Sequence, residues 1–137
     1  MRILALDHGD RRIGVAMSDE LQMIAHPVCY LSPHPFADFV GKLRELMKEK
    51  EVELILIGMP RNMDGSYGPA ALKVQEFVAA LKSAITIPVQ TVDERLTTVQ
   101  AQKFLRAGGT KSKNQRQRID QTAAAIMLQS FLDSRPV

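Results

Sequence analysis

Apolar residues are spaced along this chain in two ways, as short continuous runs and at helical intervals, and together they predict its elements. Two apolar runs over residues 3–6 and 13–17 flank a segment of Gly, Asp and Arg at residues 9–12. Because such a segment supplies turn chemistry, the two runs predict a β-hairpin. Residues 23–31 predict a third strand, and Pro27 favours the edge of a sheet because proline donates no hydrogen bond to a strand ladder.

The rest of the chain alternates helical and strand patterns. These further elements are a helix over residues 36–47, a strand over 53–58, a helix over 70–82, a strand over 85–92, and helices over 97–107 and 116–132. The order predicts an α/β fold in which helices flank a mixed five-stranded sheet. We expect a single domain over residues 1–137.

Composition narrows the class of protein. A chain of 137 residues can bury a stable core without cross-links, and its one cysteine, Cys29, cannot form an intramolecular disulfide. The chain shows neither a signal-peptide pattern at its start nor an apolar run long enough to span a bilayer. We therefore expect a cytoplasmic protein without a membrane partner. Three histidines without zinc-ligand spacing leave a hard cation on oxygen ligands as the expected metal.

The net charge of +3 is unevenly distributed. Residues 95–118 contain seven basic residues and no acidic one, whereas the remainder carries eleven basic and fifteen acidic residues, a balance of −4. Such asymmetry favours a polyanionic partner, above all a nucleic acid, although a basic helix face can also be merely solvated.

Acidic residues end two of the predicted strands. Asp7 ends the first strand, and Asp93 and Glu94 end the last. If these strands are parallel neighbours, their C-terminal ends share the edge at which open α/β sheets bind ligands. Strand alternation sends Asp93 and Glu94 to opposite faces, so only one can join Asp7, and the pattern favours neither. The simpler interpretation of Asp7 is that it caps the turn through its side chain.

A third acid, Asp120, falls on the last predicted helix. Ala123, Ala124, Met127 and Phe131 share its face at helical spacing, so the carboxylate is expected to lie on the side that packs against the core. A carboxylate in that position needs a cation or several hydrogen-bond donors. The acids together therefore favour a metal site.

Four blocks in order along the chain resemble the YqgF/RuvX family. They are residues 6–16 (LDHGDRRIGVA), 58–65 (GMPRNMDG), 93–98 (DERLTT) and 119–129 (IDQTAAAIMLQ). The pair Asp10 and Arg11 differs from the Thr-Lys that the family often has, and the acidic positions are all present. The resemblance implies a ribonuclease H-like fold, related to Holliday-junction resolvases, and a nuclease that matures the 5′ end of pre-16S rRNA.

The resemblance also assigns site residues. The family's acidic triad maps onto Asp7, Glu94 and Asp120, which are the expected catalytic residues and the ligands of two Mg²⁺ or Mn²⁺ ions. The resemblance thus favours Glu94 over Asp93. The candidate nucleic-acid-binding residues are Arg11, Arg12, Arg61, Arg95, Lys111, Lys113 and Arg116.

Other functions stay open at this point. A non-catalytic nucleic-acid-binding module, like related domains in Tex-like transcription factors, is the main alternative, but loss of the acids would be expected there. Sugar kinases and actin-like ATPases share an Asp-x-Gly hairpin, yet they close two domains around a nucleotide, and this chain has one and lacks a P-loop. The sequence separates neither RNA from branched DNA nor monomer from dimer.

Three local interpretations concern loops and a histidine. Residues 58–65 are expected to line a substrate groove, although they could form an ordinary connecting turn. His8 is interpreted as a hydrogen-bonded or surface residue and not as a metal ligand. Residues 108–115 are poor in apolar side chains, so we expect them to become ordered only when substrate binds.

Overall fold

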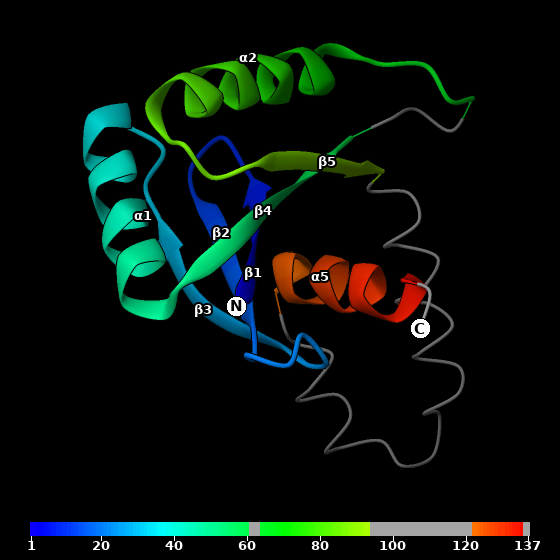
Figure 1. Ribbon diagram of the computed structural model, residues 1–137. Coiled ribbons are helices and arrows are strands. Elements are labelled where there is room, and N and C mark those ends of the chain that lie inside the picture. Colours follow the sequence, from blue (N-terminus) through cyan, green and yellow to red (C-terminus); the bar gives the residue numbers. More distant parts are fainter. Residues whose placement is uncertain (61–63, 94–121, 136–137) are drawn as a thin grey trace.

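The computed structural model describes residues 1–60, 64–93 and 122–135 (Figure 1). Within them, five strands form one sheet in the order β3-β2-β1-β4-β5. The strands are β1 (Arg2–His8), β2 (Ile13–Ser18), β3 (Ala25–Leu31), β4 (Val52–Met59) and β5 (Val89–Asp93). The described helices are α1 (Phe36–Lys50), α2 (Pro69–Ala84) and α5 (Ala123–Ser134). The predicted α/β fold with a mixed five-stranded sheet is confirmed.

The direction of the strands follows from their connections. β1 and β2 form the predicted antiparallel hairpin, and the Gly9 N–H donates to the Arg12 carbonyl at 3.1 Å to close its turn. β3 pairs antiparallel with β2 and lies at the edge of the sheet, as Pro27 predicts. β4 runs parallel to β1, and β5 runs parallel to β4. The C-terminal ends of β1, β4 and β5 therefore share one edge.

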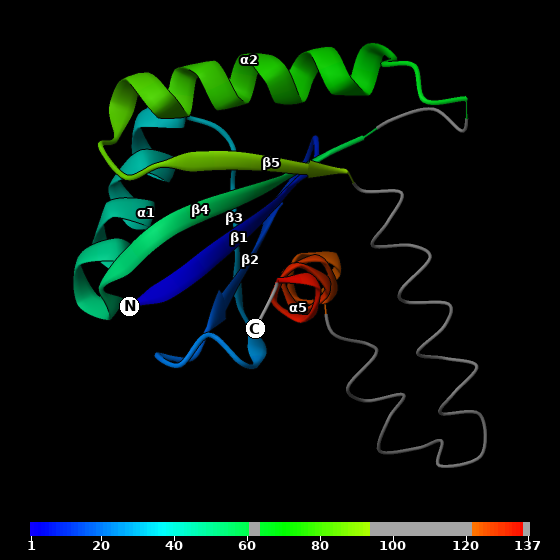
Figure 2. The same cartoon turned by 45° about the vertical axis from the view of Figure 1, so that its right-hand side comes forward.

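The sheet lies between two helical layers (Figures 1 and 2), with α1 and α2 on one face and α5 on the other. Alternate residues of β1 supply the two cores. Leu4 and Leu6 belong to the cluster under α1 and α2, whereas Ile3 and Ala5 belong to the cluster under α5. All four side chains are buried. Because side chains alternate along a strand, this pattern assigns each later residue of β1 to one face of the sheet.

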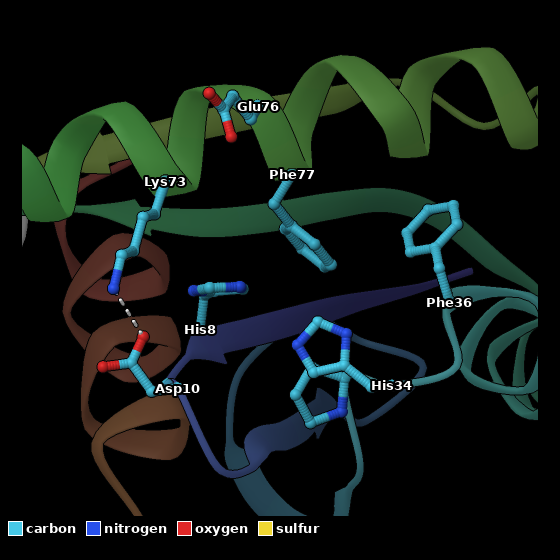
Figure 3. A pocket seen from close by; sticks show the side chains of 9 residues that line it. His8, Asp10, His34, Phe36, Lys73, Glu76 and Phe77 are labelled. Carbon is cyan, nitrogen blue, oxygen red and sulfur yellow. Dashed lines mark hydrogen bonds and ion pairs between the residues drawn. The ribbon is translucent and has the colours of Figure 1, made fainter.

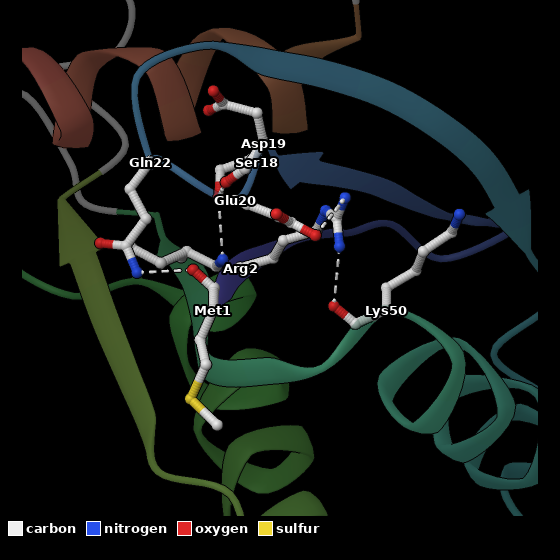
Figure 4. Close-up of polar contacts among 8 residues, drawn as sticks. Met1, Arg2, Ser18, Asp19, Glu20, Gln22 and Lys50 are labelled. Atoms are coloured by element: carbon white, nitrogen blue, oxygen red, sulfur yellow. Dashed lines mark hydrogen bonds and ion pairs between the residues drawn. The ribbon is translucent and has the colours of Figure 1, made fainter.

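The start of β1 is held by hydrogen bonds from neighbouring elements (Figure 4). The buried Ser18 hydroxyl accepts from the Ile3 N–H at 2.9 Å and donates to the Asp19 carbonyl at 2.9 Å. Arg2 donates to the Lys50 carbonyl at the end of α1, at 3.1 Å. These contacts hold the start of β1 in place. Since Asp7 lies near the end of the same strand, they also help to fix its position.

Helix α5 is tied to the edge of the sheet by Gln129. Its side-chain oxygen accepts from the Ala25 N–H at 2.9 Å, and its side-chain nitrogen donates to the Met23 carbonyl at 3.1 Å. Both contacts bridge more than a hundred residues of sequence. No described helix combines the length and the apolar character needed to cross a membrane.

Two predicted element starts are wrong by four residues or more. The strand predicted from residue 85 begins at Val89, because Ile85 ends α2 by donating to the Leu81 carbonyl, and Pro88 has no N–H for the ladder. The helix predicted from residue 116 begins at Ala123. Thr122 is extended, and its hydroxyl accepts from the Ala125 N–H at 3.2 Å, which makes it the N-cap.

The later start changes the face argument for the last helix. Its buried residues are Ala124, Ala125, Met127, Leu128 and Leu132, whereas Ala123 is exposed and Phe131 is only half-buried. The predicted core face is therefore correct for Ala124 and Met127, and Phe131 packs against the same core, but the buried face also includes Ala125, Leu128 and Leu132 and excludes Ala123. Asp120 precedes α5, lies outside the described residues, and loses the support of that face argument.

Candidate active site

Asp7 lies on the face of the sheet that α5 covers, one residue before the end of the central strand β1. Across the ladder Asp7 pairs with Gly14. A Cβ added to Gly14 would lie 3.7 Å from the Asp7 Cβ and 3.8 Å from the Ala124 Cβ. The Asp7 side chain is thus half-buried beside the first turn of α5, whose N-terminal end lies against β1 and β2 in Figure 1. The partial positive charge of a helix N-terminus attracts a carboxylate there.

Strand register decides which acid at the end of β5 can share that face. Asp93 pairs with Met59, whose side chain packs in the core under α1 and α2. Val92 packs in the other core, under α5. Asp93 therefore lies on the face opposite Asp7, which excludes it as a partner of Asp7 on this sheet.

A basic residue and an aromatic residue lie together on the face of Asp7. The Arg12 guanidinium carbon lies 3.9 Å from the centroid of the Tyr30 ring. Tyr30 pairs with Gly14, and its Cε1 would lie 3.5 Å from a Cβ placed there. Arg11 and Arg12, both predicted to bind nucleic acid, are exposed. Tyr30 was not predicted from the sequence, because only the pairing of β3 with β2 brings it beside the hairpin.

A separate pocket of about 360 Å³ opens on the other face of the same sheet edge (Figure 3). His8 and Phe77 lie against each other in its lining, with ring centroids 4.7 Å apart. Lys73 and Asp10 form an ion pair at 3.2 Å at its rim. Burial lowers the pKa of His8. The nearby carboxylates of Asp10 and Asp7 raise it, but their effect is smaller than that of burial. His8 therefore lies against an aromatic ring on the face opposite Asp7.

Several predicted site residues fall outside the part of the chain that the structure describes. They are Arg61, Glu94, Arg95, Lys111, Lys113, Arg116 and Asp120. The same is true of the predicted helix over residues 97–107, the predicted loop over 108–115, and the centre of the predicted groove loop over 58–65. Among the described residues, no group of three or more His, Cys, Asp or Glu side chains could hold a metal ion.

Comparison with known proteins identifies the family. The model of the RuvX family, described as Holliday junction resolvase, matches residues 1–134. The chain belongs to this family. Its membership makes the protein a nuclease, and the resemblance drawn from the four sequence blocks is confirmed.

Relatives in this family match the chain over nearly its whole length. A protein of Caldanaerobacter subterraneus subsp. tengcongensis named as a pre-16S rRNA nuclease is 44% identical over 136 residues, which is 98% of both chains. A protein of Heliobacterium modesticaldum with the same name is 44% identical and covers 98% of this chain and 91% of its own.

Solved structures establish the fold. Thermus thermophilus RuvC in complex with Holliday junction substrate superposes with a TM-score of 0.55 at 11% identity, over 98% of this chain and 97% of its own. The fowlpox virus Holliday junction resolvase gives a TM-score of 0.51 at 14% identity, over 98% and 100%. The fold of this RuvX-family chain is ribonuclease H-like, as predicted.

Proposed function

We propose that this protein is a divalent-metal-dependent nuclease in which Asp7, Glu94 and Asp120 hold the metal. The observation that carries the proposal is the position of Asp7, a half-buried carboxylate at the end of a central strand beside a helix N-terminus. Open α/β sheets bind their ligands at this edge.

The alternation of β5 supports Glu94 as the second acid. Val92 packs on the face of Asp7 and Asp93 lies on the opposite face, which excludes Asp93 and leaves Glu94 as the candidate acid of this block. Gly58 pairs with Val92, and β4 leaves no side chain at that position between β1 and β5. Gly58 is itself buried, so no β4 side chain separates Asp7 from Val92 on that face.

The chemistry of the donors fits Mg²⁺ or Mn²⁺. Carboxylate oxygens are the ligands that these hard cations prefer, and several carboxylates can share one site only when a cation neutralises them. When bound, two such ions activate water and stabilise the leaving oxygen of a phosphodiester. Asp7 would hold the ions from β1, while Arg12 on the same face orients the phosphate backbone.

The proposed substrate is pre-16S rRNA, which the relatives' names support, and the family resemblance implies cleavage at its 5′ end. The description of the family supports a second substrate, the Holliday junction. Both are structured nucleic acids that expose a phosphate backbone, and phosphate contacts do not distinguish them.

A cleavage assay tests the function and separates the substrates. The purified protein is incubated with a four-way DNA junction and with a pre-16S rRNA fragment, each with Mg²⁺, with Mn²⁺ and with chelator. We expect metal-dependent cleavage of the RNA at its 5′ end, and none by Asp7→Asn. Cleavage of the junction alone would show that the substrate is branched DNA and not the rRNA precursor. Binding of either substrate without cleavage under any metal would support the non-catalytic alternative.

A further inference from the structure

Tyr30 and Arg12 form a stacked pair on the surface beside Asp7. Tyr30 is on the edge strand β3 and is 47% exposed, although it is a large aromatic residue. The Arg12 guanidinium lies over its ring at 3.9 Å and is itself exposed. Arg12 ends the turn of the β1–β2 hairpin, so the two residues come from segments that only the sheet register brings together.

Gly14 connects this pair to the acidic site. Tyr30 and Asp7 lie on the two sides of Gly14 in one row across the sheet, since Gly14 pairs with both of them. A Cβ on Gly14 would lie within ordinary contact distance of both side chains. Gly14 is itself buried, so the absent side chain lets the Tyr30 ring and the Asp7 side chain approach the same position from its two sides.

The chemistry of the pair matches one kind of ligand. Nucleobases stack on aromatic rings and on guanidinium planes, and an arginine beside the stack can also contact phosphate. A base inside a continuous duplex presents no free face, so only an unpaired nucleotide can use such a surface. Neutral apolar ligands would not account for the exposed guanidinium.

We propose that Tyr30 and Arg12 form a stacking platform for an unpaired nucleobase next to the phosphate held at the Asp7 site. The proposal rests on the nuclease function proposed above and narrows its substrate class. Substrates carry at least one unpaired nucleotide adjacent to the cleavage position, as a single-stranded end or a splayed junction does. Fully paired duplex does not engage the platform.

The chain contains no tryptophan, so Tyr30→Trp places one fluorescent reporter on the platform. Binding is measured in chelator, which prevents cleavage, with a single-stranded DNA oligonucleotide and with its fully paired duplex. We expect the single strand to quench the tryptophan emission and the duplex to leave it unchanged. Unchanged emission at saturating single strand, or equal quenching by both, would overturn the proposal.

Tyr30→Leu tests the aromatic face with apolar volume retained. We expect its affinity for the single strand to fall roughly 5- to 150-fold, the range for loss of one base stack, while Tyr30→Phe keeps wild-type affinity. Leu21→Ala is the matched control, since Leu21 is 80% exposed in the β2–β3 turn at the opposite end of the sheet. Equal affinities of Tyr30→Leu and wild type would contradict the platform.

The two proposals fail separately. Cleavage by wild type without selective quenching of Tyr30→Trp would overturn the platform and leave the nuclease function standing. Selective quenching without cleavage in any metal would support the platform and overturn the nuclease function.

Discussion

Asp7 pairs directly with Gly14 across the β1–β2 ladder, and this pairing leaves the carboxylate flanked by a position without a side chain. Gly14→Ala adds a methyl group 3.7 Å from the Asp7 Cβ, which is ordinary contact, so the fold is expected to persist. Stability should be unchanged or rise by up to about 1 kcal/mol, because glycine in a strand loses more backbone entropy on folding.

The same substitution should impair the chemistry of the site. The methyl group restricts where the Asp7 side chain and a bound nucleotide can lie, and a small misplacement of reacting groups can reduce a rate by about 100-fold. We expect cleavage by Gly14→Ala to fall by roughly 10- to 100-fold in a steady-state assay. Wild-type cleavage by a folded Gly14→Ala would show that this space is not used.

Gly9 is expected to be intolerant of a side chain. A Cβ there would lie 2.6 Å from the Arg12 backbone oxygen, the acceptor that closes the hairpin turn. Gly9→Ala should lower the free energy of unfolding by about 1–3 kcal/mol in chemical denaturation. Gly41→Ala is the control, since nothing lies within 4 Å of its Cβ in α1, and it should stabilise by about 0.5–1 kcal/mol. Equal effects would refute the steric argument.

Asp7→Asn and Asp120→Asn should each abolish cleavage and leave nucleic-acid binding largely intact. The amide keeps the shape of the side chain and removes the charge that a divalent cation requires. Metal-free stability should be equal to wild type or higher, because repulsion among neighbouring carboxylates is relieved. Calorimetry without metal and a cleavage assay with metal measure the two effects. Turnover at the wild-type rate by either variant would rule out that residue as a metal ligand.

The basic segment over residues 111–116 should contribute through phosphate contacts. Replacing Lys111, Lys113 and Arg116 with glutamine should weaken binding to all sequences alike. The slope of log affinity against log salt should flatten by roughly 0.7 to 0.9 for each lost contact. Lys48 and Lys50, exposed in the last turn of α1, provide the control pair. A slope equal to that of the control would mean that the segment is only solvated.

Stability should decrease in mild acid because of His8. Burial lowers its pKa in the folded state below the ordinary histidine value of 6.5, so the unfolded chain binds the proton more readily. The free energy of unfolding should therefore fall as the pH drops through 6.5 toward the folded-state pKa. His8→Phe, which keeps a ring against Phe77, should show a weaker dependence between pH 7 and 5 in thermal melts. Parallel profiles for the two proteins would exclude His8 as the cause.

The hydrophobic pattern was sufficient for the elements of the sheet. The two runs around residues 9–12 predicted the hairpin, and Pro27 predicted the edge strand, because these features depend on local turn chemistry and on a missing N–H. The boundaries of β5 and α5 were not predictable in the same way. The start of β5 depends on the hydrogen bond between the Ile55 N–H of β4 and the Pro88 carbonyl, and the start of α5 depends on the Thr122 cap. The spacing of apolar residues does not show either interaction.

The acidic positions of the candidate site were also visible in the sequence, since family blocks carry them. Alternation alone separated Asp93 from Glu94, but it left open which of the two shares the face of Asp7. Only the register of β4 with β5 decided that Asp93 does not, because it pairs with Met59 above the other core.

The sequence by itself determined the order of elements, the hairpin and the presence of an acid at the end of the first strand, because local spacing and turn residues encode them. The tertiary structure decided what surrounds that acid. Asp7, Tyr30 and Ala124 are far apart in the chain, and they meet around Gly14 only through strand pairing and the docking of α5. Such contacts depend on register, which a pattern of apolar positions along a single strand does not specify.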